Sequence, residues 1–159
     1  PPRCRNAVQI RAPPHTLICA AHSQRVSTGP PHTHMPVIRQ LTMPKDANAL
    51  GTIFGGVILA QIDQAAAIEA HRHHVGRVVT VAMDRVEFKQ PVLIGDLVSY
   101  FTTTRKVGRT SVAIDVNVWA QRQFAEAGDF IPVTDACVTM VAVDEDCKPL
   151  PLNRPQKQG

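Results

Sequence analysis

The chain has 159 residues, enough for one domain with an ordinary hydrophobic core. Apolar residues make up 44% and charged residues 19% of the sequence, which is typical of a folded protein and excludes a wholly disordered one. The four basic residues of the first 34, with no acidic residue among them, account for the formal net charge of +4. The remainder carries 13 basic and 13 acidic residues, so its charge does not favour a nucleic-acid partner.

Two features bear on where the protein resides. No apolar run reaches the roughly 18 residues that cross a bilayer, so no membrane span is expected. The four cysteines have neither the spacing of a metal site nor that of a disulfide framework; they are Cys4, Cys19, Cys137 and Cys147. We interpret them as reduced thiols of a cytoplasmic protein.

The chain divides into an end segment, a domain and a short tail. Residues 1–34 contain six prolines and no sustained hydrophobic period, so we expect a disordered or non-native extension, with Met35 as the natural start. The folded domain is expected over 35–152. Residues 153–159 form a C-terminal tail.

The first half of the domain contains one helix. A short strand is expected at 36–43 and a loop of turn-forming residues at 44–51. From residue 53 or 54 to about 71, alanines and isoleucines leave little polar surface before Glu69, which is typical of a helix buried nearly all round. Gly76 ends the basic stretch that follows.

Four runs with the alternation of β-strands come next, and no helix pattern separates them. They are residues 77–88, 96–107, 110–122 and 133–144. Strands joined in this way pair as an antiparallel meander or a near relative of one, so the sequence predicts an α+β fold with the sheet wrapped around the helix. The open edges of such a sheet favour dimerisation.

One stretch places glycines at a helix start and a carboxylate two turns later: "MPKDANALGTIFGGVILAQID", residues 43–63. It is similar to the corresponding motif of the YciA-type acyl-CoA thioesterases. "GRVVTVAMDRVEFKQPVLIGDLV", "KVGRTSVAIDVNVW" and "VTDACVTMVAVDEDCKPLP" continue the resemblance, which covers 35–152. The resemblance implies the hotdog fold and hydrolysis of a fatty acyl-CoA to the free acid and coenzyme A. It implies no metal and no bound organic cofactor.

The resemblance also implies that Asp63 is catalytic and that a backbone amide at the helix start polarises the thioester carbonyl. The residues fit these roles, because the N–H groups of Gly55 and Gly56 lack partners inside the helix and the helix dipole adds positive character there. Whether Asp63 acts as a general base on water or as a nucleophile is left open.

The spacing of these groups points to a dimer. Asp63 follows Gly55 by eight residues, roughly 12 Å along a helix axis, so one thioester carbonyl cannot contact both. We infer that Asp63 of one subunit acts with Gly55 of its partner, with the two helices side by side. The resemblance implies the same arrangement. Assembly beyond the dimer, a trimer of dimers included, is left open.

Four further polar residues are less specific. Asn48 either caps its loop or orients substrate or water. Thr52 stands where the family often has Asn or Asp, although its hydroxyl can still donate one hydrogen bond. Asp84 and Glu87 alternate with apolar neighbours and are interpreted as solvated strand positions.

The candidates for binding the coenzyme A phosphates are Arg77, Arg109, Thr110 and Ser111. The last three form a tight turn that offers a guanidinium, two hydroxyls and backbone donors, with an ordinary hairpin turn as the alternative. Three histidines near the helix end could suggest a metal; they are His71, His73 and His74. Their spacing spreads them around the axis, so a basic helix terminus is favoured over a metal site.

Two other functions remain open. A non-catalytic acyl-CoA-binding or sensing module is one, and the combination of Asp63 with the glycines argues against it. The other is a hotdog dehydratase acting on hydroxyacyl thioesters. Such enzymes use a histidine paired with an acid, and the absence of any histidine after His74 counts against this function.

Overall fold

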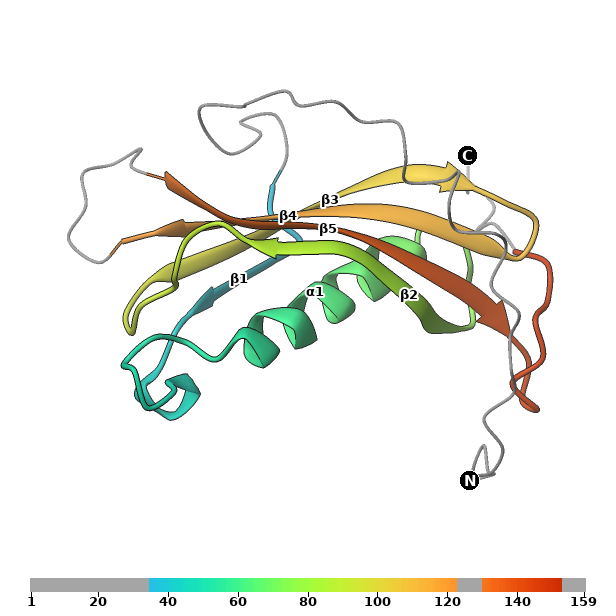
Figure 1. Ribbon diagram of the computed structural model, residues 1–159. Coiled ribbons are helices and arrows are strands. Elements are labelled where there is room, and N and C mark those ends of the chain that lie inside the picture. Colours follow the sequence, from blue (N-terminus) through green and yellow to red (C-terminus); the bar gives the residue numbers. More distant parts are fainter. Residues whose placement is uncertain (1–34, 123–129, 153–159) are drawn as a thin grey trace.

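The computed structural model describes residues 35–122 and 130–152, which form a curved five-stranded sheet packed on one central helix (Figure 1). The elements are β1 (Ile38–Leu41), the short 3₁₀ helix η2 (Pro44–Asp46), α1 (Gly55–Ala70), β2 (Arg77–Phe88), β3 (Leu97–Val107), β4 (Ser111–Gln121) and β5 (Phe130–Val143). The predicted α+β fold is confirmed. The predicted end segments, 1–34 and 153–159, lie outside the described residues.

The sheet is antiparallel throughout, in the order β1-β3-β4-β5-β2. The predicted meander holds for β3, β4 and β5. It fails for β2, which pairs with β5 at the far edge instead of with β3, the next strand in the chain. Three strand spacings, about 14 Å, separate β2 from β3, and a connection of residues 89–96 is long enough to cross that distance. Strands β1 and β2 are therefore the open edges.

Helix α1 lies across the concave face of the sheet, and its burial is one-sided (Figure 1). The buried positions include Ile58, Ile62, Ala65 and Ala66, which pack on the inward-facing valines and isoleucine of β4. Exposed positions recur every four residues on the opposite side, at 56, 60, 64 and 68. The sequence predicts burial nearly all round, so this prediction is wrong for the single chain. The exposed side is mostly apolar, so it is a surface on which another protein chain could pack.

The inner core continues into β3, where Tyr100 is almost fully buried. Its surroundings are apolar, and this burial raises the pKa of the Tyr100 hydroxyl well above its usual value, so the ring stays neutral.

Among the described residues, no helix is long and apolar enough to cross a membrane. Cys137 is buried and forms no disulfide, whereas Cys147 is disulfide-bonded, so the prediction of reduced thiols is wrong for Cys147.

A buried ion pair fixes the connection between β2 and β3. Asp96 is 1% exposed, and its Oδ2 accepts from Arg122 Nη1 at 2.5 Å and from the Leu93 N–H at 2.8 Å. Arg122 also donates to the Pro91 carbonyl at 2.9 Å. The loop held in this way supplies the Val92 carbonyl, which accepts from the Ile53 N–H just ahead of α1. The ion pair therefore supports the segment that leads into the helix.

We expect Asp96→Ala to lower the free energy of unfolding by about 3 kcal/mol, because it leaves a half-buried guanidinium and a backbone N–H without their acceptor. Urea titration followed by circular dichroism measures the loss. Lys89→Ala is the control, because the Lys89–Asp135 pair lies on the surface and is worth less than about 1 kcal/mol. Equal losses in the two variants would contradict a special role for Asp96.

Candidate functional site

The segment that enters α1 is folded around Asn48. Its Oδ1 accepts from the N–H groups of Leu50 at 2.9 Å and Thr52 at 3.2 Å, and its Nδ2 donates to Thr52 Oγ1 at 2.9 Å. Side-chain bonds to backbone groups two to four residues away are how an asparagine closes a turn. These contacts support the loop-capping role for Asn48, with the Thr52 hydroxyl as one of its acceptors, and a role toward substrate stays a prediction for Asn48.

The helix begins with amides that point away from any backbone acceptor. Phe54 is extended, with φ −62° and ψ 128°, and its N–H donates to the Asp46 carbonyl at 2.9 Å. The next intrahelical donor is Val57, bonded to the Phe54 carbonyl at 2.9 Å. Among the backbone bonds of the described residues, none uses the N–H of Gly55 or Gly56. Both amides are therefore available to an anionic oxygen, as the sequence predicts.

Gly55 is also a point of close approach. A Cβ added there would lie 3.3 Å from Cζ of Phe88, at the end of β2, so glycine lets the aromatic ring pack against the helix start. Gly56 faces outward on the exposed side of α1. The helix start is thus flanked by an aromatic ring on one side and open on the other.

Asp63 lies two turns further along α1 and is half-buried. Its Oδ1 accepts a hydrogen bond from Thr80 Oγ1 on β2, the strand that follows the helix. Sequence reasoning missed Thr80. The one signal for it is a hydroxyl within the otherwise apolar stretch 78–83, and such a residue has no fixed partner until the fold brings β2 beside the helix. The hydrogen bond orients the carboxylate, and within the described ranges its second oxygen, Oδ2, accepts no hydrogen bond.

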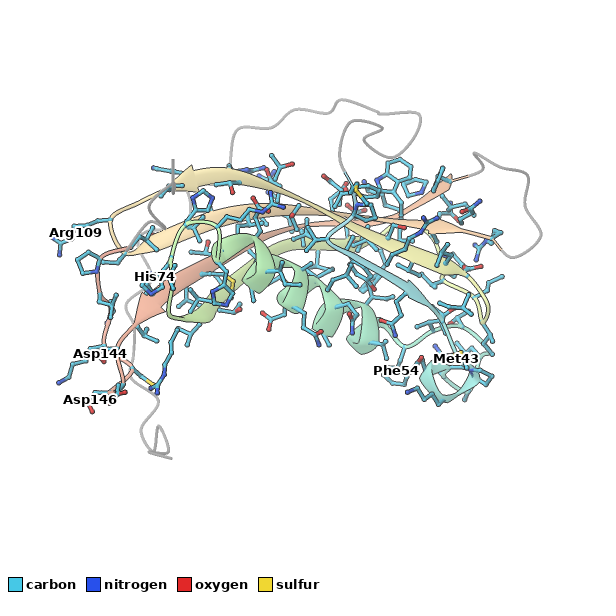
Figure 2. All side chains as sticks on the ribbon, turned by 180° about the vertical axis from the view of Figure 1, so that it is seen from behind. Met43, Phe54, His74, Arg109, Asp144 and Asp146 are labelled. Atoms are coloured by element: carbon cyan, nitrogen blue, oxygen red, sulfur yellow. The ribbon has the colours of Figure 1, made fainter. Side chains whose placement is uncertain are left out.

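The predicted phosphate-binding residues lie at the other end of the molecule from the start of α1. Figure 2 shows Arg109 and His74 at one end, and Phe54 and Met43 at the other. Arg109 sits in the turn between β3 and β4, where its carbonyl accepts from the Leu152 N–H at 2.9 Å and the Thr110 carbonyl accepts from the Ala142 N–H at 2.9 Å. Both carbonyls thus have partners, and the Arg109 side chain points outward at the molecule's edge (Figure 2).

The other two phosphate candidates share this end of the sheet. Arg77 opens β2 and forms a long ion pair, 3.8 Å, with Glu145 between exposed side chains. Ser111 opens β4, opposite Val141, and its carbonyl accepts from the Gly108 N–H at 2.7 Å across the turn. The structure therefore brings the predicted residues to one end of the sheet.

The three histidines face different partners. His71 Nδ1 lies 3.4 Å from the His74 carbonyl, His73 Nε2 lies 2.8 Å from Thr104 Oγ1, and His74 is buried. Within the described ranges, no three potential metal ligands gather in one place. The strand residues Asp84 and Glu87 differ from each other: Glu87 is exposed, while Asp84 is half-buried and has an interaction partner.

Comparison with known proteins identifies the family of this chain. Residues 50–123 match the family model described as the thioesterase superfamily. The chain is 43% identical to the acyl-CoA thioester hydrolase YciA of Salmonella typhimurium over 117 residues, which are 73% of this chain and 88% of that protein. The chain belongs to the YciA-type acyl-CoA thioesterases. The segment that matches the family model, residues 50–123, contains the glycines at the helix start, Asp63 and Thr80.

Solved structures of other family members share the fold. A hexameric hotdog-fold thioesterase of Campylobacter jejuni is 44% identical, with a TM-score of 0.71 over 77% of this chain and 92% of that one. An acyl-CoA hydrolase from Staphylococcus aureus, described in complex with butyryl coenzyme A and coenzyme A, is 30% identical, with a TM-score of 0.66 over 74% of this chain and 70% of that one. The predicted hotdog fold is therefore confirmed.

We expect Thr80→Val, which removes the hydroxyl at nearly constant volume, to lower kcat for acyl-CoA hydrolysis about tenfold, the value of one hydrogen bond to a charged group. Thr80→Ser keeps the hydroxyl and serves as the matched control. Steady-state hydrolysis with released thiol as the readout measures both. Equal rates for the valine and serine variants would show that the bond to Asp63 does not matter for turnover.

Proposed function

We propose that this protein hydrolyses fatty acyl-CoA thioesters to the free acid and coenzyme A. The observation that carries the proposal is the hydrogen bond that orients the Asp63 carboxylate on α1, the helix that begins with the two available amides of Gly55 and Gly56. A thioester needs both kinds of group, a base or nucleophile for its carbonyl carbon and donors for the oxyanion that develops.

The reaction follows from these groups. The amide at a helix start holds the thioester oxygen, and negative charge on that oxygen is stabilised as the carbonyl carbon becomes tetrahedral. Asp63 either takes a proton from water, whose oxygen then attacks the carbon, or attacks the carbon itself to give an anhydride that water opens. In both routes the carbon–sulfur bond breaks and coenzyme A leaves as the thiol after it gains a proton.

The site needs two copies of the chain. Eight residues of helix keep Gly55 and Asp63 of one chain roughly 12 Å apart. The exposed, mostly apolar side of α1 and the open edge at β2 are the surfaces that a second copy would cover. The relative from Campylobacter jejuni is described as hexameric, which supports a trimer of such dimers.

The proposed dimer also places the coenzyme A phosphates near basic residues. If the two α1 helices run antiparallel, the helix start of the partner lies toward the end of this chain that carries Arg109 (Figure 2). Strand β2 begins at the same end with Arg77, because Arg77 pairs with Val143 of β5 and Ser111, two residues after Arg109, pairs with Val141. The nucleotide phosphates of coenzyme A would then bind the exposed guanidinium groups, with Thr110 and Ser111 as additional donors. The Staphylococcus aureus relative, described with coenzyme A bound, supports this class of ligand.

The two alternatives receive less support. The sensing module requires only binding, and it gives no reason for an oriented carboxylate beside Thr80. For the dehydratase, the three histidines of the 71–74 segment would have to reach the thioester. His73 contacts Thr104 and His71 contacts the His74 carbonyl, at the C-terminal end of α1 and not at Asp63.

A cytoplasmic location is part of the proposal. The buried Cys137, which forms no disulfide, supports it, and the disulfide of Cys147 argues for a more oxidising compartment. Thiol labelling of the protein immediately after rapid lysis separates the two, because a cytoplasmic protein would label at Cys147 without prior reduction.

We expect Asp63→Asn to lower kcat by roughly 10²-fold or more on a panel of acyl-CoAs of increasing length, because the amide keeps the shape of the side chain and loses its basicity. The Thr80 hydroxyl can still donate to the amide oxygen, so the melting temperature should change little. Released thiol, thermal melt and affinity for a non-hydrolysable acyl-CoA analogue are measured on the same preparation.

Two results would count against the proposal. Wild-type protein that binds the analogue and releases no thiol from any acyl-CoA would favour the sensing module. Near wild-type turnover in Asp63→Asn, together with a lowered melting temperature, would make Asp63 a structural anchor.

A further inference from the structure

A second acidic side chain of α1, which the proposed reaction does not use, is buried at the end of the helix. Glu69 is 5% exposed, and its carboxylate accepts from two hydroxyls of β3, Thr102 Oγ1 at 3.0 Å and Thr104 Oγ1 at 2.8 Å. Arg72, whose side chain is 68% exposed, lies 3.3 Å from Oε2. Because Thr104 donates its one hydrogen to Glu69, the bond between His73 Nε2 and Thr104 Oγ1, 2.8 Å, has the imidazole as donor.

The burial of the Glu69 carboxylate between α1 and β3 is energetically unfavourable compared with an apolar side chain. Burying an ionised group costs free energy even when every acceptor is paired, and apolar side chains of the same shape often pack there equally well. The neighbouring buried residues of α1 are small: Ala65, Ala66 and Ala70. Alanines present a smooth surface that allows a helix to rotate or slide, whereas hydrogen bonds are directional. The hydrogen bonds of Glu69 therefore fix the rotation of this end of α1, which its alanines do not fix.

The helix is then held at two points on different sides. Asp63 bonds to Thr80 on β2, and six residues later Glu69 bonds to Thr102 and Thr104 on β3. At 3.6 residues per turn, the two carboxylates lie roughly 120° apart around the helix axis. Strands β4 and β5 lie between β2 and β3 in the sheet. Two such attachments fix both the rotation and the axial position of α1.

We propose, building on the hydrolase function above, that Glu69 is a positioning residue. The clasp of Glu69, Thr102 and Thr104 sets the rotation of α1 and thereby aims the Asp63 carboxylate at the thioester carbonyl.

The test separates positioning from the cost of burial. In the variant Glu69→Leu/Thr102→Val/Thr104→Val, the carboxylate and both hydroxyls are replaced together by apolar groups of similar shape, so neither hydroxyl is left without a partner. Only the exposed Arg72 and the half-buried imidazole of His73 lose a partner. We expect its melting temperature to lie within ~5 °C of the wild type, since such replacements are often neutral. We expect kcat to fall about tenfold with KM changed less than about threefold, because a displacement near 1 Å can cost up to ~10²-fold.

Two single variants complete the set. Arg72→Ala removes only the exposed partner of Glu69 and should keep the wild-type kcat. Glu69→Gln keeps the shape and one acceptor oxygen, and it serves if the triple variant does not fold; we expect kcat to fall at least about threefold at unchanged KM. A folded triple variant, or in its absence Glu69→Gln, with wild-type kcat would overturn the proposal.

A crystal structure of the triple variant gives a readout that does not depend on activity. We expect the hydrogen bond between Thr80 and Asp63 to be broken or displaced, and its retention in the wild-type geometry would overturn the positioning role. If the wild-type protein hydrolyses no acyl-CoA, the proposed function fails, while this structural comparison still decides whether Glu69 positions Asp63.

Discussion

Helix α1 carries both of the groups that the proposed reaction needs, and its rigidity keeps them apart. Gly55 and Asp63 lie eight residues apart on α1, so the amide proposed to bind the oxyanion and the carboxylate proposed to attack or activate water cannot serve one carbonyl within one chain. Bending the helix would break its backbone hydrogen bonds and is not observed. If both groups act on one thioester, as proposed, they come from two copies of the chain.

The surface of the monomer fits this constraint. The side of α1 away from the sheet is exposed at every fourth residue, and it carries Ala60 and Ile68 where an isolated helix would carry charge. Strand β2 leaves the sheet edge open beside it, and Thr80 lies on that same strand. Burial of this side in a dimer would bring two half-sites together and would remove water from the Asp63 carboxylate, which strengthens its interactions in the transition state.

The sequence could predict elements whose signals are local. The alternation over 77–88 matches the bounds of β2, and the glycines and Asp63 stand out because their chemistry conflicts with an otherwise apolar helix. Asn48 could be read as a loop cap, since its partners are within four residues.

Contacts across the fold could not be predicted in this way. Thr80 reaches Asp63 across 17 positions, and Thr102 and Thr104 reach Glu69 across 33 and 35. The edge position of β2 depends on how the sheet closes over α1. The alternation of residues within a strand does not show which other strand it pairs with. Glu69 shows the limit most clearly, because a polar residue near a helix end reads as a solvent-exposed one until its partners on β3 are known.

Subunit complementation tests the shared site most directly. Gly55→Ala keeps the amide hydrogen and controls for the added carbon, because a Cβ at this position would lie 3.3 Å from Cζ of Phe88. Gly55→Pro adds ring carbons there and also removes the amide hydrogen, at a first helical position that suits proline and after a Phe54 that is already extended. This variant and Asp63→Asn should each be nearly inactive, with losses of ~10²-fold or more. Unfolded together in equal amounts and refolded, they should recover about a quarter of the wild-type turnover, because one pairing in four combines an intact Gly55 with an intact Asp63 from the other chain. A mixture that stays as inactive as its parents, although subunit exchange is verified, would contradict a site shared between two copies.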